Sequence, residues 1–172
     1  TEAWRFTPVR PIVEADLLRR GTDTPKLRSS LPEGVIVRSM KAVLESEPEL
    51  LEGKLDLAGP PEHFAALNTV LFDDGLWVDV PAGMVVQTPI EVEHTIGAEG
   101  VGYPRVLVTA GRGAEVTLIE TYTGAGVGHL TNSVVEVDLA ANATVRHVRI
   151  HENARLQVGR VDVRQAADSE YR

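Results

Sequence analysis

The sequence predicts a mainly β protein, with a right-handed parallel β-helix (β-solenoid) over residues 73–172 and a short mixed helical and irregular segment over residues 1–72. Three observations lead to this prediction. Prolines break the first segment into short pieces, apolar and polar residues alternate from Gly75 onward, and a valine-to-turn motif recurs at near-regular spacing.

The N-terminal segment, residues 1–72, is expected to contain four short elements. A helix over Glu14–Arg20 would end at Gly21, which suits a C-terminal cap. A brief strand is expected at Val35–Val37 and a helix over Ser39–Leu51. A third, better marked helix is expected over Pro61–Leu71, where apolar residues fall at helical spacing and proline suits the first turn.

The segment from residue 73 to residue 172 carries the repeat. Each copy begins with valine and places a turn-forming residue at its sixth position, and the copies start 30, 29 and 26 residues apart. The sixth residue is Gly, Gly, Asn or Asp, the residues that best tolerate a left-handed backbone conformation. The copies are Val78–Gly83, Val108–Gly113, Val137–Asn142 and Val163–Asp168.

A near-regular repeat of this length is typical of stacked units that share one core, so strand, tight corner, strand and return loop would form one coil of a β-helix. An antiparallel sandwich or jelly roll is the structural alternative, because its strands have similar lengths. The sequence ends inside its fourth copy without a visible cap. We therefore expect either a piece of a longer protein or a homodimer through the β-helix end.

Composition excludes several classes of function. The 17 basic residues face 25 acidic ones, for a formal charge of −8, which argues against nucleic acid or an anionic membrane surface as the main partner. No apolar stretch approaches the roughly 18 residues of a membrane span, and no secretion signal is apparent, so a cytoplasmic location is expected. The absence of cysteine excludes disulfides, thiolate metal sites and direct cysteine ligation of an iron–sulfur cluster by this chain.

The histidines are weak candidates for a metal site. His147 and His151 lie about 13 Å apart if their segment is a strand, too far to share one ion. In strands, Glu93 and His94, like Glu62 and His63, would point to opposite faces and form no acid–base pair. His129 follows a glycine-rich loop and is expected to face solvent.

Other motifs are better explained by structure than by chemistry. The glycine-rich run 124–128 lacks the lysine of a phosphate loop and precedes a predicted strand, Leu130–Leu139, rather than a helix. Asp73 and Asp74 fit a turn before a strand, although with Asp79, Glu91 and Glu93 they could seed a carboxylate pair of the glycosidase kind. The remaining candidates are Trp4 and Trp77, expected to be packing residues, and Ser133, which has no visible base. The sequence thus predicts no catalytic residue and no metal ligand.

Several segments together resemble the SufD family. The run 2–8 (EAWRFTP) is similar to a segment near the start of SufD proteins, and 64–69 with 72–75 and 80–83 is similar to the family's entry into its β-helix. Further resemblance covers 103–108, 113–120, 130–136 and 168–169. The related SufB proteins usually carry a cysteine in an E-G-C motif where this chain has Glu120, Thr121 and Tyr122, so the resemblance favours SufD.

The resemblance implies a role that the residues themselves do not specify. SufD-like proteins are non-enzymatic scaffold subunits that pair with SufB and the ATPase SufC in iron–sulfur cluster assembly, and the whole complex holds a cluster transiently. The family's SufC-binding and cluster-holding residues lie in a C-terminal part beyond Arg172, so no functional residue is transferred. Two alternatives remain: a polysaccharide-active β-helix enzyme with an external carboxylate and arginine cluster, and a self-assembling structural β-solenoid.

Overall fold

The computed structural model describes residues 10–21, 23–55, 63–97, 100–124, 130–152 and 156–172. The described chain is mainly β, as predicted, and its helices lie in the N-terminal part. The elements in order are α1 (Arg10–Val13), β1 (Asp23–Leu27), β2 (Ile36–Ser39), α2 (Met40–Ser46), the 3₁₀ helix η2 (Pro48–Leu50), α3 (His63–Leu71), β3 (Leu76–Val80), β4 (Ile90–Ile96), β5 (Val101–Gly102), β6 (Arg105–Ala110), β7 (Glu115–Gly124), β8 (Leu130–Leu139), β9 (Thr144–His151), β10 (Leu156–Gln165) and β11 (Glu170–Tyr171).

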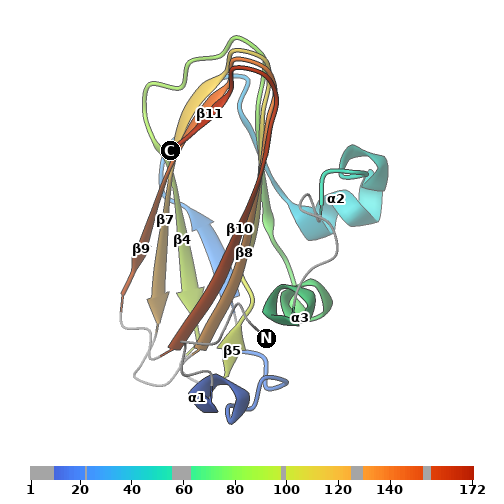
Figure 1. Cartoon of the computed structure of the whole chain (residues 1–172), viewed down its shortest axis with the longest axis vertical. Coiled ribbons are helices and arrows are strands. Elements are labelled where there is room, and N and C mark those ends of the chain that lie inside the picture. The colour runs from blue at the N-terminus through green and yellow to red at the C-terminus, as the bar shows by residue number, and fades with distance from the viewer. Residues whose placement is uncertain (1–9, 22, 56–62, 98–99, 125–129, 153–155) are drawn as a thin grey trace.

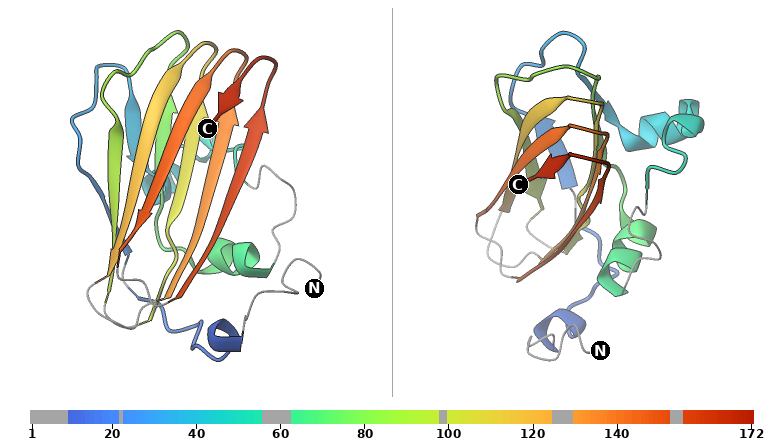
Figure 2. Two further views of the ribbon diagram at one scale, coloured as in Figure 1. Left: turned by 60° about the vertical axis from the view of Figure 1, so that its left-hand side comes forward. Right: turned by 45° about the horizontal axis from the view of Figure 1, so that its top comes forward.

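The strands form two facing sheets. One has the order β1-β4-β7-β9-β11, and the other has the order β10-β8-β6-β3-β2, with β5 paired beside β8. From β3 onward the paired strands are parallel, and most successive strands along the chain alternate between the two sheets (Figure 1; Figure 2). Both inward faces meet in a core of valine, leucine, isoleucine and alanine.

The predicted right-handed parallel β-helix is not confirmed as such, because both sheets are mixed. The strands β1 and β2 pair antiparallel with β4 and β3, respectively. Both precede the first copy of the repeat, so the repeat could not predict their direction. Pro25 at the centre of β1 also concealed that strand; a proline is tolerated there because β1 lies at the edge of its sheet. The division of the chain at residue 72, into a mixed N-terminal segment and a β-helix core, stays a prediction.

The repeated corner is confirmed in detail. Its sixth residues all have positive φ: 74° at Gly83, 66° at Gly113, 61° at Asn142 and 57° at Asp168. Successive corners also lie in contact, since the amide of each of the first three donates to the carbonyl group just before the sixth residue of the next corner, at 2.8 to 3.1 Å. The four turns therefore form one column beside the parallel strands.

This column makes one substitution informative. A Cβ added at Gly113 meets no heavy atom within 4 Å, so Gly113→Ala changes only the backbone strain at φ +66°. We expect it to lower the free energy of unfolding by about 1–2 kcal/mol. Gly113→Asn is the matched control and should cost less, because Asn142 occupies the equivalent position. Equal unfolding free energies for the wild type and the alanine variant in urea titrations would contradict this account.

The short N-terminal elements agree with the sequence in part. The strand near Val35 and the two later helices are present, with Ser39 capping α2 through its hydroxyl. The prediction of a helix over Glu14–Arg20 was wrong, since helix α1 ends at Val13. Asp16 accepts a hydrogen bond from the amide of Leu18, and this local turn competes with a helix.

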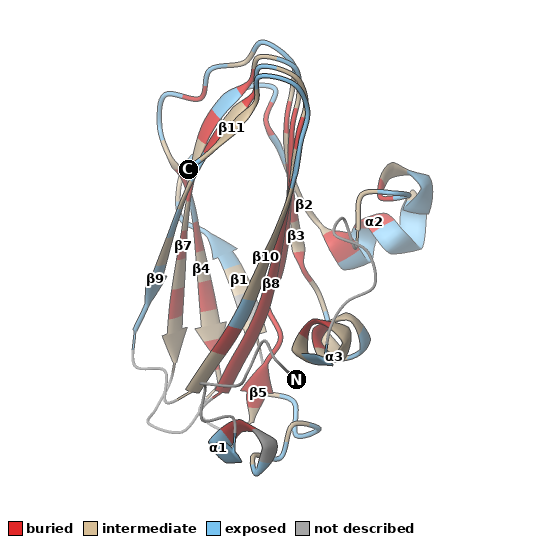
Figure 3. Ribbon diagram, in the orientation of Figure 1, coloured by how far each residue is buried: buried red, intermediate tan, exposed pale blue. Residues whose placement is uncertain are grey.

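Helix α3 covers the outer face of the six-stranded sheet and is fixed there by buried polar groups (Figure 3). Asn68 is fully buried and donates to the carbonyl oxygens of Pro104 and Asn132, at 3.1 and 2.8 Å. Next to it, Arg105 pairs with Glu136 at 2.9 Å and donates to the Thr69 hydroxyl. Within the described helices, none is long and apolar enough to cross a membrane.

Candidate functional site

Polar side chains interrupt the apolar core at one level between the sheets. The inward positions of β4 read Ile90, Val92, His94, Ile96, and those of β7 read Val116, Leu118, Glu120, Tyr122. On β9 the same face carries Val145, His147, Arg149 and His151. On β7 and β9 the inward face begins apolar and becomes polar toward the C-terminal half, whereas β4 places His94 alone between Val92 and Ile96, and these polar positions lie on neighbouring parallel strands.

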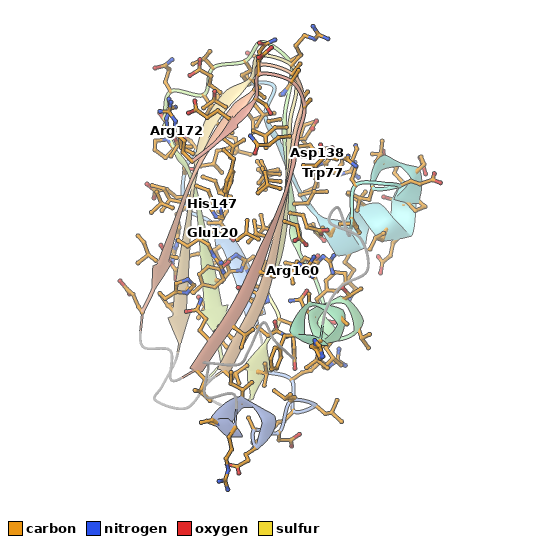
Figure 4. The ribbon with its side chains drawn as sticks, in the orientation of Figure 1. Trp77, Glu120, Asp138, His147, Arg160 and Arg172 are labelled. Carbon is orange, nitrogen blue, oxygen red and sulfur yellow. The ribbon has the colours of Figure 1, made fainter. Side chains whose placement is uncertain are left out.

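Glu120 lies at the centre of this polar level. Its side chain is fully buried, and its two oxygens contact different histidines: Oε1 lies 3.3 Å from His94 Nε2, and Oε2 lies 2.6 Å from His147 Nε2. The Tyr122 hydroxyl also donates to Oε1, at 2.9 Å. Glu120 and His147 lie between the two sheets (Figure 4). A buried carboxylate is stable only when such partners offset its lost hydration.

Two further groups extend the contacts to both edges of the five-stranded sheet. Asp23 Oδ1 lies 3.5 Å from His94 Nδ1, and the Tyr171 hydroxyl lies 2.8 Å from His147 Nδ1. The resulting set, Asp23, His94, Glu120, His147 and Tyr171, takes one residue from each strand in the order β1, β4, β7, β9, β11. We call it the buried row. Its members are diagonal neighbours across the strand register, a separation that long side chains can bridge.

A second layer packs against the buried row. The Tyr122 ring stacks between the rings of His94 and His151, with centroid distances of 4.8 and 4.6 Å. The Arg149 guanidinium lies 5.2 Å from the Tyr122 ring and donates to the Ser133 hydroxyl on the facing sheet. These contacts fix the orientations of the ionisable groups and place the Arg149 cation beside the Tyr122 ring.

The charges in the row depend on one another. Burial alone would lower the pKa of His94, but hydrogen bonds and charge from Asp23 and Glu120 outweigh it and raise the pKa to about 9. For Glu120, burial alone would raise the pKa, and the hydrogen bonds from His147 and His94 instead hold it well below its usual range. Burial, followed by the charge of Glu120, raises the pKa of Tyr122. His94 is therefore a cation and Glu120 an anion at neutral pH.

The arrangement brings acid–base groups together. Within the described residues no group of three histidine, aspartate or glutamate side chains is placed to hold a metal ion. What the row provides is a set of proton donors and acceptors, hydrogen-bonded from His94 through Glu120 and His147 to Tyr171, with apolar clusters on both sides.

A separate groove lies on the outside of the six-stranded sheet, with a volume of about 630 Å³. Its polar floor follows the strand register from Asp79 through Thr109 and Asp138 to Arg164. Thr109 donates to Asp79, while Arg164 pairs with Asp138. The groove thus holds the external carboxylate and arginine cluster that the polysaccharide alternative predicts, and each carboxylate is hydrogen-bonded to a neighbour.

Most of the candidate residues that the sequence analysis considered together lie apart in the structure. His147 and His151 make different contacts, His147 in the row and His151 against Tyr122 and Gln157. Glu93 and His94 point to opposite faces as predicted, with Glu93 paired to Arg28 at 2.7 Å. Asp79 and Glu91 lie in different sheets and form no pair.

The remaining candidates have structural roles. Asp74 accepts hydrogen bonds from Ser39, from the Lys41 amide and from the Gly75 amide, which confirms its turn role. Trp77 is a packing residue, as predicted, and is buried, with its indole donating to Thr109. Asp73 is exposed at the end of α3. The strand expected after the glycine-rich run is β8. Trp4, Glu62, His129 and the run 125–128 lie outside the described residues.

Sequence reasoning missed most of the buried row: Asp23, Glu120 and Tyr171 were not singled out. A signal for Glu120 was present in the second and third repeat copies, where the alternate inward positions change from apolar to polar along the strand. Stacking these two copies by their turns aligns Glu120 with Arg149 and Tyr122 with His151, whereas the first copy is offset by two further residues. Asp23 and Tyr171 could not be found in this way, since neither lies in such an alternating run.

Comparisons with known proteins identify relatives of the chain. Residues 94–172 match the SufBD core domain of the SUF system for iron–sulfur cluster assembly, and residues 20–92 match the SufBD protein N-terminal region. Proteins described as iron–sulfur cluster assembly SufBD family proteins are 28% identical in Staphylococcus saprophyticus and 29% identical in Staphylococcus aureus, each over 123 residues. These alignments cover 69% of the chain but 26% of each relative, so the chain spans about a quarter of the length of the curated relatives it matches.

Proposed function

Because the chain belongs to the SufB/SufD family of the SUF iron–sulfur cluster assembly system, we propose that it is part of a SufD-type, non-catalytic scaffold subunit. The single observation that carries the proposal is the pair of adjoining family matches, which together cover most of the chain. The lack of cysteine supports the SufD type: Glu120-Thr121-Tyr122 stands where SufB-like sequences carry an E-G-C motif. Without a thiol, this chain contributes no cysteine ligand to a cluster.

The proposed partners are a SufB-like paralogue and a SufC-like ATPase, in the cytoplasm. Parallel strands stacked with their turns in one column give a rigid frame, and we propose that the frame continues as a β-helix in the longer protein. Strand addition at the end of such a frame is a recognised way for two chains to associate, and it would also allow a homodimer. Iron and sulfur are cargo in this proposal, held transiently by the whole complex.

The two alternative functions have less support. A polysaccharide-active enzyme would need an external carboxylate and arginine cluster, and Asp79, Asp138 and Arg164 in the external groove provide one, with both carboxylates hydrogen-bonded to neighbours. A self-assembling solenoid would need uniform repeats, whereas these drift from 30 to 26 residues. Neither alternative accounts for two adjoining matches to an assembly family.

Co-expression tests the proposal. The longer protein that contains this chain, tagged at one end, is produced together with a SufB-like paralogue and a SufC-like ATPase, and an unrelated tagged protein serves as the control. We expect both partners to be retained with the chain and neither with the control. Retention of neither partner, while the two partners still bind each other, would overturn the proposed role.

A further inference from the structure

Strand β1 contributes little to the hydrophobic core, although it lies directly beside it. None of the β1 side chains that the structure describes is buried, and Leu27 is 37% exposed. Its neighbour β4 differs, because Ile90, Val92 and Ile96 are each at most 1% exposed. A segment with few buried apolar contacts opens at a lower free energy than the core against which it lies.

The side-chain contacts between β1 and β4 are also weak. The Arg28 guanidinium, at the end of β1, pairs with Glu93 at 2.7 Å, but the two side chains are 50% and 24% exposed, and an ion pair so open to water stabilises little. Asp23 Oδ1 and His94 Nδ1 lie 3.5 Å apart without a well-formed hydrogen bond. Backbone hydrogen bonds with β4 are therefore the main attachment of β1.

Strand β2 provides the comparison. It too is a short antiparallel strand at the edge of its sheet. Unlike β1, it is anchored at both ends, since Val35 just before it and Met40 just after it are 8% and 0% exposed and belong to hydrophobic clusters. An edge position alone thus does not leave a strand loosely held, and what β1 lacks is an apolar anchor.

We propose that β1 is a releasable strap that opens without the rest of the fold and exposes the edge of β4. The segments on either side of the strap stay attached: the Gly21 amide donates to the Val101 carbonyl at 2.8 Å, and Leu31 packs against the core. Between these two points the strap lifts away from Ile90–Ile96. An uncovered strand edge has free backbone donors and acceptors, so the strap controls whether this edge is open to strand addition.

Release has a second consequence inside the fold. Asp23 lines a pocket of about 380 Å³ together with Leu71 and Tyr103. When the strap lifts, Asp23 leaves both this pocket and His94. The strap therefore closes the β4 edge and one wall of the pocket at the same time.

The strap goes beyond the proposed function and is independent of it. Its release needs no partner, so it can fail while the co-purification succeeds, and it can succeed while the co-purification fails.

Amide hydrogen exchange at residue resolution tests the strap, measured by mass spectrometry on the longer protein that contains this chain. The Arg28 amide donates to the Glu91 carbonyl at 2.8 Å, and in an antiparallel pair such bonds recur at every second residue. The amides of Glu93 and Thr95 on β4 therefore face β1, and their exchange reports its release.

The amides of Val92 and His94, which face β7, are the matched control on the same strand. We expect the amides that face β1 to exchange on the order of 100-fold faster than these, with rates that depend only weakly on added urea, because the opening is local. The amides that join β2 to β3 should stay slow, because Val35 and Met40 anchor that strand. Equal exchange on the two sides of β4, or exchange in β2 as fast as in the strap, would overturn the proposal.

Discussion

Replacing Arg105 with methionine is expected to lower the free energy of unfolding by about 3–5 kcal/mol, because it leaves the Glu136 carboxylate buried without its cation. Both side chains are at most 1% exposed, and two guanidinium nitrogens of Arg105 contact Glu136 Oε2, at 3.2 and 2.9 Å. Arg105 also donates to Thr69 and lies over the Phe72 ring, so the substitution loosens α3 as well. Urea titration at neutral pH measures the effect.

The control for this prediction is the double variant Arg105→Met/Glu136→Met. Because it removes both charges together, it should recover a large part of the loss. A double variant less stable than Arg105→Met alone would show that loss of the ion pair with Glu136 is not the cause of the destabilisation.

Glu120→Gln is expected to cost about 3 kcal/mol or more near neutral pH, since it removes the anion shared by two buried histidines. It should also change how stability depends on pH. In the folded wild type the pKa of His94 is raised to about 9 from 6.5, so between these values the folded state binds more protons than the unfolded state. Stability from this group is therefore complete below about pH 6.5 and is lost as the pH rises toward 9.

Without Glu120, Asp23 is the remaining anionic partner of His94 among the residues that the structure describes, so the fall in stability over that pH window should shrink. Urea titrations at several pH values measure both effects. Glu93→Gln is the matched control, because Glu93 lies on the outer face beside His94 and pairs with Arg28. Removing this partly exposed ion pair should cost no more than about 1 kcal/mol and leave the pH dependence intact. Equal pH dependence in the wild type and Glu120→Gln would contradict the shared-carboxylate account.

Local signals in the sequence predicted much of the fold. The turn residues Gly83, Gly113, Asn142 and Asp168 identified the corners because positive φ is a property of the residue itself, and alternating valines identified the strands. The direction of β1 and β2 was not predictable, since pairing at a sheet edge depends on partners far away in the sequence. For the same reason α1 was misplaced, because distant Tyr103 binds the Leu17 carbonyl in the turn that replaces the expected helix.

The candidate site was harder to predict than the fold. His147 and His94 were noticed as residues, but their meeting through Glu120 requires the register of three strands at once. The strand spacing correctly separated His147 from His151. It gave no information about diagonal contacts between coils, and those contacts form the buried row.

The protonation state of His94 tests the buried row most directly. The nitrogen chemical shifts of its imidazole ring can be followed by NMR from pH 5 to pH 10. A histidine held between Asp23 and Glu120 should be protonated on both nitrogens at pH 7.5 and should titrate near pH 9. A ring that is already neutral at pH 7.5, with a midpoint at or below its ordinary value of 6.5, would contradict the arrangement of charges described above.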